Sequence, residues 1–143
     1  MKTVNQILAE KGKQVWSIKP DAQVYDALKL MADKDVGALL VLEHNNVIGL
    51  LSERDYARKV VLMGKTSMTT PVSEIMTRRV VFISPDQSIE ECMALMTAKR
   101  IRHLPVLENE ELIGIITIGD VVKAIISEQE FMISQLENYI KGS

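Results

Sequence analysis

Residues 20–55 read PDAQVYDALKLMADKDVGALLVLEHNNVIGLLSERD, and residues 85–120 read PDQSIEECMALMTAKRIRHLPVLENEELIGIITIGD. The two stretches align without a gap at an offset of 65 residues. In the wider alignment of 15–60 with 80–125, 14 of the 46 pairs are identical, whereas chance gives about three at ordinary residue frequencies. The chain therefore contains an internal duplication, and that duplication decides the fold.

Both copies show the same order of hydrophobic patterns. Apolar residues within 24–31 and 89–96 recur at i, i+3, i+4 and i+7, which is typical of one face of a helix. The expected strands are 15–18, 36–42 and 47–51, with 80–83, 101–107 and 112–116 in the second copy. A second helix is expected after Ser52 and after Thr117. The fold class is therefore α/β, built from two β-α-β-β-α repeats.

A repeat of about 60 residues buries too little surface to be stable alone, so the two copies are expected to pack with pseudo-twofold symmetry. Gly64 to Pro71 is a polar break between them. Short lead-in segments, residues 4–8 and 72–76, begin each repeat. The predicted domains are 1–65 (first repeat), 66–127 (second repeat) and 128–143 (a C-terminal helical extension).

The composition argues against several classes of binding site. Hydrophobic residues make up 47% and charged residues 25%, and the net charge of −2 does not suggest nucleic-acid or membrane binding. Cys92 is the only cysteine, which excludes an intrachain disulfide and a zinc cluster. The N-terminal residues lack the apolar core of a signal peptide, and the expected location is cytoplasmic.

One motif ends both hairpins: Gly49 to Asp55 and Gly114 to Asp120 share the pattern Gly-apolar-apolar-Ser/Thr-x-x-Asp. The hydroxyl stands at a strand-to-helix junction, where free helix N–H groups attract a phosphate. The Asp, one helical turn on, could hold a ribose diol. The same spacing also fits a capping box, in which both side chains only satisfy the helix's free donors.

The chain closely resembles CBS domains over residues 1–127. The resemblance rests on this motif, on the Pro-Asp before each first helix, and on the sequence Arg100 to Val106. CBS domains occur in pairs, called Bateman modules. The resemblance implies adenosyl ligands in two clefts between the repeats, with AMP as the leading candidate and ATP, NAD or S-adenosylmethionine as others.

The resemblance also implies two unequal clefts. One would combine Ser52 and Asp55 with cationic Arg102 and His103 from the second copy, and would hold phosphate. Its further lining residues would be Arg54, Arg58, Val81, Phe82, Ile83, Ile101 and Leu104. The other cleft would combine Thr117 and Asp120 with Ser17, Ile18, Val36, Gly37, Ala38 and Leu39. Gly37 and Ala38 replace the cationic pair, so this cleft is expected to bind more weakly or to prefer a less charged ligand.

No activated nucleophile or acid–base pair can be assembled from these motifs, so the chain is not expected to be an enzyme. His103 is interpreted as a phosphate contact or a structural residue. The basic stretch Lys99 to His103 has no aromatic stacking platform beside it, which favours a small anion over nucleic acid.

A long helix is expected from Thr117 to about Ile140. Its residues Val122, Ile125, Gln129, Met132, Leu136 and Tyr139 form a heptad seam with one polar position. A chain of this size has little to cover the distal seam, which predicts a homodimer. The expected function is a stand-alone regulatory ligand sensor read by an unidentified protein partner. The alternative is a structural or interaction module with vestigial clefts.

Overall fold

The computed structural model describes residues 2–142 and divides into two compact units. The first unit is Val15–Val81. The second unit combines Met1–Gln14 with Phe82–Ser143. The chain therefore passes between the units twice, near residues 14–15 and near residues 81–82.

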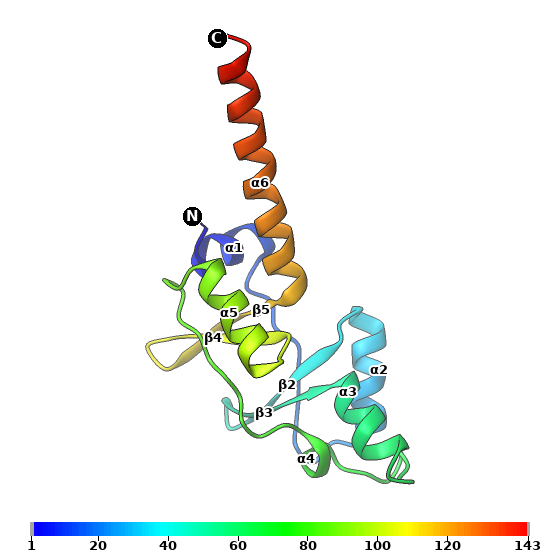
Figure 1. Ribbon diagram of the computed structural model, residues 1–143. Coiled ribbons are helices and arrows are strands. Elements are labelled where there is room, and N and C mark those ends of the chain that lie inside the picture. Colours follow the sequence, from blue (N-terminus) through cyan, green and yellow to red (C-terminus); the bar gives the residue numbers. More distant parts are fainter. Residues whose placement is uncertain (1, 143) are drawn as a thin grey trace. The chain divides into compact units, whose positions relative to one another are not determined.

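The first unit contains a three-stranded sheet in the order β1-β2-β3. Its elements are β1 (Ser17–Ile18), α2 (Val24–Lys34), β2 (Ala38–Glu43), β3 (Asn46–Ser52), α3 (Glu53–Tyr56), the π-helical turn η1 (Ala57–Val61) and α4 (Val72–Ile75) (Figure 1). Strand β1 pairs parallel to β2, and β2 pairs antiparallel to β3. This is the β-α-β-β-α order that the sequence predicts.

The second unit contains the same hairpin and helices. Its elements are α1 (Val4–Lys11), α5 (Ile89–Lys99), β4 (His103–Glu108), β5 (Glu111–Thr117) and α6 (Ile118–Ile140). The expected strand at 80–83 is wrong, because only a single parallel bridge forms, between Ile83 and Val106. In the first unit the Leu40 amide donates to Trp16, and the position equivalent to Leu40 is Pro105, which has no N–H to donate.

The two lead-in segments are exchanged between the repeats. Residues 72–76 begin the second repeat, yet Val72, Ile75 and Met76 are buried in the core of the first unit. Conversely, Val4, Ile7 and Leu8 are buried in the second unit, where α1 contacts β5. The compact units therefore divide the chain differently from its sequence repeats.

The same main-chain contacts attach both lead-in segments. The Val72 amide donates to the Ala22 carbonyl, and the Val4 amide donates to the Gln87 carbonyl, both at 2.8 Å. Each segment also forms one antiparallel bridge, Gln23 with Pro71 and Thr3 with Ser88. Because 22 and 87, like 23 and 88, differ by the repeat offset, the exchange is symmetric.

A glycine in each hairpin permits the close approach of the lead-in segment. A Cβ atom on Gly114 would lie 2.7 Å from Leu8 Cδ2. A Cβ atom on Gly49 would lie 2.7 Å from Met76 Sδ and 3.1 Å from the Thr77 main-chain oxygen. These glycines are among the 14 identities of the repeat because both hairpins are covered in the same way.

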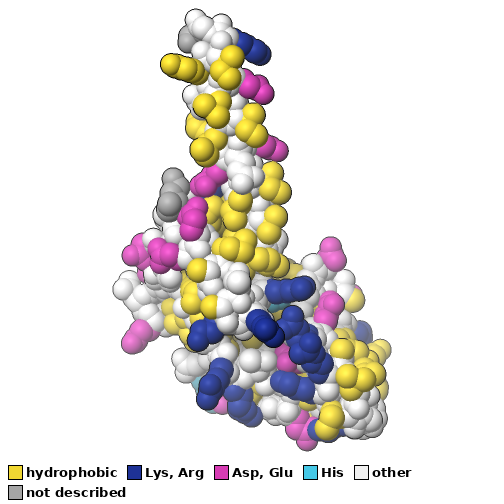
Figure 2. Space-filling view, viewed as in Figure 1, with side chains coloured by type: hydrophobic (Ala, Val, Ile, Leu, Met, Phe, Trp, Pro, Cys, Tyr) yellow, Lys and Arg dark blue, Asp and Glu magenta, His cyan; other side chains and the backbone are white. Residues whose placement is uncertain are grey.

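Helix α6 follows the predicted span, but only its first turns are covered. Val121 and Ala124 are buried, whereas every described residue from Gln129 onward is exposed. Figure 2 shows hydrophobic side chains along this distal part, with acidic side chains beside them. The exposed apolar residues there are Phe131, Met132, Ile133, Leu136, Tyr139 and Ile140.

We expect Gly49→Ala to lower the free energy of unfolding by about 1–3 kcal/mol, the usual cost of overpacking a core. Gly114→Ala should cost less, because its added methyl meets only the flexible end of Leu8. Gly37→Ala is the control, since its Cβ would meet only Glu53 Oε1, at 3.9 Å. Urea unfolding measures all three, and an unchanged midpoint for Gly49→Ala would contradict the packing described.

Candidate functional site

Both Ser/Thr-x-x-Asp motifs form capping boxes. The Ser52 hydroxyl accepts from the Asp55 amide at 3.2 Å, and the Ser52 amide donates to Asp55 Oδ2 at 2.9 Å. Thr117 and Asp120 repeat this geometry with the same two distances, at the start of α6. The capping interpretation is therefore confirmed at both junctions, and the two carboxylates differ only in their other neighbours.

The carboxylate of Asp55 is buried and accepts at both oxygens. Besides its capping contacts, Oδ2 accepts from the Ser52 hydroxyl at 3.1 Å. The other oxygen, Oδ1, lies 3.1 Å from the Thr77 hydroxyl and 3.0 Å from Lys59 Nζ. Lys59 also donates to the Ile75 carbonyl. A carboxylate has about four acceptor positions, and Asp55 uses them all. Ser52 takes Oδ2 in the cap, while Thr77 and Lys59 take Oδ1 and hold residues 75–77 to the first unit.

The carboxylate of Asp120 has a different environment. Lys11 Nζ lies 2.6 Å from Asp120 Oδ2 and donates to the Ile115 carbonyl at 2.9 Å. Both the capping contact and the ion pair fall on Oδ2. The Asp120 side chain is 20% exposed, compared with 8% for Asp55. Asp120 is therefore the carboxylate that a solvent-borne ligand reaches more easily.

Two further basic residues lie in the second unit beside this junction. His103 is the cross-strand partner of Thr117, and the Ile118 amide donates to the Arg102 carbonyl at 2.9 Å. Burial lowers the pKa of His103 below its usual 6.5, and the positive charges of Arg102 and Lys11 lower it further, while Asp120 acts in the opposite direction. The unit thus gathers three basic side chains around a helix N-terminus.

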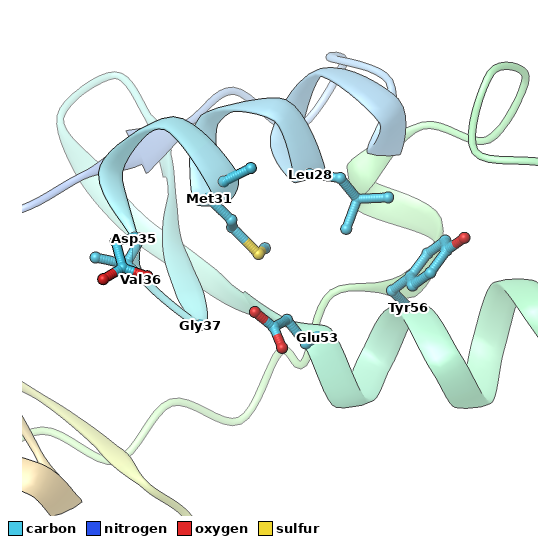
Figure 3. A pocket seen from close by; sticks show the side chains of 8 residues that line it. Leu28, Met31, Asp35, Val36, Gly37, Glu53 and Tyr56 are labelled. Atoms are coloured by element: carbon cyan, nitrogen blue, oxygen red, sulfur yellow. The ribbon is translucent and has the colours of Figure 1, made fainter.

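In the first unit, acidic side chains line the space beside the equivalent positions. Gly37 and Ala38 occupy the positions of Arg102 and His103, and the Glu53 amide donates to the Gly37 carbonyl as the Ile118 amide does to that of Arg102. A cavity of about 540 Å³ lies here, between α2 and α3, with Met31, Leu28 and Tyr56 facing it (Figure 3). Its other lining residues are Ala32, Asp35, Val36, Gly37 and Glu53. Two carboxylates and no basic side chain line it, which disfavours a phosphate.

The predicted site residues are distributed over the two units. Ser52 and Asp55 lie in the first unit with Ser17, Ile18, Val36–Leu39, Arg54, Arg58 and Val81, whereas Thr117 and Asp120 lie in the second with Phe82, Ile83 and Ile101–Leu104. Arg102 and His103 therefore share a unit with Thr117 and Asp120. The predicted combination of residues from both repeats in one cleft stays a prediction.

Three residues that contact the carboxylates were missed by the sequence reasoning. Lys59 lies one helical turn beyond Asp55, so its i, i+4 spacing could have identified it. Lys11 and Thr77 carry no such signal. They reach the carboxylates only because the lead-in segments are exchanged between the repeats.

The described residues form neither a metal site nor a membrane span. Within residues 2–142, His, Cys, Asp and Glu side chains form no group of three that could hold a metal ion. Over the same residues, no helix has the length and apolar character that a membrane crossing requires.

Comparison with known proteins identifies relatives along nearly the whole chain. CBS domain-containing protein CBSX3, mitochondrial, from Arabidopsis thaliana is 37% identical over 150 residues, covering 98% of this chain and 72% of the relative. CBS domain-containing protein YhcV from Bacillus subtilis is 32% identical over 130 residues, covering 91% and 85% respectively. Both relatives are named for their CBS domains alone.

Solved structures show the same fold. A protein with CBS domains from Burkholderia ambifaria MC40-6 is 52% identical, with a TM-score of 0.87 over 90% of this chain and 96% of that one. The CBS domain pair of protein MJ0100, solved in complex with 5′-methylthioadenosine and S-adenosyl-L-methionine, is 22% identical with a TM-score of 0.79 over 90% and 98%. At that identity the likeness concerns the fold only.

The model of the CBS domain family matches this chain twice, over residues 11–62 and 72–127. The two matches coincide with the two repeats found in the sequence. The chain is a tandem CBS-domain protein.

Proposed function

We propose that the chain is a regulatory module that binds an adenine nucleotide, with AMP as the leading candidate, at the junction of β5 and α6. The observation that carries this proposal is the group of Lys11, Arg102 and His103 around Thr117 and Asp120, all within the second unit. A phosphate there would meet basic side chains and the N-terminal end of a 23-residue helix.

Each residue of the group has a role that its chemistry suits. Asp120 accepts from the ribose hydroxyls, with Oδ1 as the oxygen that its capping contact leaves aside. The Thr117 hydroxyl and the basic side chains take the phosphate through charge-assisted hydrogen bonds, which are about twice as strong as neutral ones. MJ0100, which shares the fold, binds adenosyl ligands.

In this proposal the phosphate-bearing ligand lies at Asp120, whereas the sequence predicts it at Asp55. The basic pair was assigned to the cleft of Ser52 and Asp55, but within its own unit it stands beside Thr117 and Asp120. Asp55 is fully occupied, and the first unit offers Asp35 and Glu53 near Gly37. We therefore assign the phosphate-bearing ligand to Asp120, and any ligand at Asp55 would be weaker or uncharged.

The runner-up function is a structural or interaction module whose clefts bind nothing. The capping boxes at both junctions favour it, because capping alone explains why Ser/Thr and Asp occur at this spacing. The buried network around Asp55 favours it further in the first unit. The structural interpretation does not explain why Arg102 and His103 are basic at one junction, whereas Gly37 and Ala38 occupy the equivalent positions at the other.

Self-association and a signalling output complete the proposal. The Burkholderia relative is thought to act in signal transduction, and a binding module can signal only if its ligand favours one conformation over another. The exposed apolar face of α6 supports a homodimer. The cytoplasmic location stays a prediction, since the Arabidopsis relative is named as mitochondrial.

We expect Asp120→Asn to weaken AMP binding about tenfold or more, because a charged acceptor for the ribose diol is lost. Asp55→Asn is the matched control. It should leave the affinity for AMP within about twofold, yet lower the urea midpoint, because the Lys59 and Thr77 contacts weaken. Isothermal titration with AMP measures both affinities. Equal losses in the two variants would contradict the assignment of the phosphate site, and no AMP binding by the wild type would favour the structural module.

The affinity for AMP should rise as pH falls, through His103. In the free protein its pKa lies below 6.5, and a bound phosphate would raise that pKa, so the complex takes up a proton. Binding therefore strengthens between about pH 7 and pH 5, relative to a His103→Gln variant. Comparison with this variant cancels the ionisation of AMP itself. Parallel pH profiles for the two proteins would show that His103 does not face the phosphate.

Leu136→Glu should convert the dimer to a monomer, because it places a charge in the middle of the exposed apolar face of α6. Ser134→Glu adds the same charge on the other side of the helix and should leave the dimer intact. Light scattering gives the mass of each variant. A monomeric wild type would rule out the homodimer.

A further inference from the structure

Lys11 lies where α1 ends, just before the chain leaves the second unit for the first. It is the last residue of α1, and residues 12–16, which lead from the second unit into the first, form no helix or strand. Its ammonium group joins three elements of the second unit: α1, which carries it, the carbonyl of Ile115 on β5, and the carboxylate of Asp120 on α6. Lys11 therefore makes the side-chain polar contacts that hold the last residue of α1 to β5 and α6.

The other crossing is held differently. It begins after Thr77, whose amide and carbonyl both pair with Leu50 of β3, at 2.8 and 2.9 Å. Its hydroxyl is also bound to the buried carboxylate of Asp55. Main-chain hydrogen bonds to a strand do not depend on the charge of a neighbouring ligand, whereas an ion pair between two partly exposed side chains does. The two crossings thus differ in their sensitivity to a bound anion.

We propose that Lys11 is the residue that detects the ligand's phosphate, and that it leaves Asp120 and Ile115 to do so. This inference rests on the nucleotide site proposed above. The ribose hydroxyls supply other donors to the Asp120 carboxylate, while the phosphate, with a charge of about −1.5 to −2, attracts Lys11 more strongly than the single carboxylate charge. The polar contacts of Lys11 with Ile115 and Asp120 are lost while Leu8 still packs against Gly114, so the freedom gained is at the end of α1 and in residues 12–16.

The first test compares AMP with adenosine, which differ only in the phosphate. Lys11→Met should weaken AMP binding about tenfold, as for the loss of one charge-assisted contact, and should leave adenosine binding unchanged or tighter. Lys13→Met is the matched control, because it removes the same charge from an exposed position two residues away. It should leave the ratio of the two affinities as in the wild type.

The second test follows the crossing itself by hydrogen exchange. In the wild type, AMP should speed the exchange of the amides in residues 9–16, and adenosine should not. In Lys11→Met these amides should exchange fast without ligand and should not respond to AMP, although the variant remains folded by circular dichroism. Lys13→Met should behave as the wild type does.

The outcomes separate the two proposals. If the wild type binds neither AMP nor adenosine, the proposed function fails and the role of Lys11 fails with it. If AMP binds but Lys11→Met and Lys13→Met lower its affinity equally, or if AMP leaves the exchange of residues 9–16 unchanged, the role of Lys11 is wrong while the nucleotide site stands.

Discussion

The exchange of lead-in segments is the contact on which the rest of this structure depends. Each β-hairpin needs cover over its glycine, and in each unit a short segment from the other repeat supplies it. Leu8 against Gly114 and Met76 against Gly49 are equivalent contacts, made by two segments that are attached through the same main-chain contacts. A repeat of about 60 residues buries too little surface to be stable alone. Here a short segment of the other repeat completes the core of each unit.

The exchange also explains how two equivalent junctions acquire different chemistry. Both repeats contain the same capping geometry, and Ser52 and Thr117 cap their helices with matching distances. Besides Lys59, the residues that reach the two Asp side chains lie just beyond the lead-in segments, and Lys11 and Thr77 are not equivalent positions of the repeat. One segment delivers a threonine hydroxyl to a buried carboxylate, and the other delivers an ammonium group to a partly exposed one.

Sequence reasoning was reliable where structure follows from local pattern. The duplication, the helices with an apolar face, the hairpins and the span of α6 were all predicted, because hydrophobic periodicity is a local property. The strand at 80–83 failed for an equally local reason, the missing N–H of Pro105, which a closer comparison with Leu40 would have revealed. The contacts of Lys11 and Thr77 could not be predicted, because nothing in the sequence indicates that the lead-in segments change places.

The site shows why a motif alone does not distinguish a cap from a ligand-binding residue. Capping uses the amide and one oxygen of the Asp, and the second oxygen is free to serve another purpose. At Asp55 the second oxygen is used within the protein, because it is buried and accepts from Thr77 and Lys59. At Asp120 both contacts made within the second unit share Oδ2, and the basic side chains nearby suit an anion. Capping and binding are therefore compatible roles of one side chain, and the neighbours of the carboxylate decide between them.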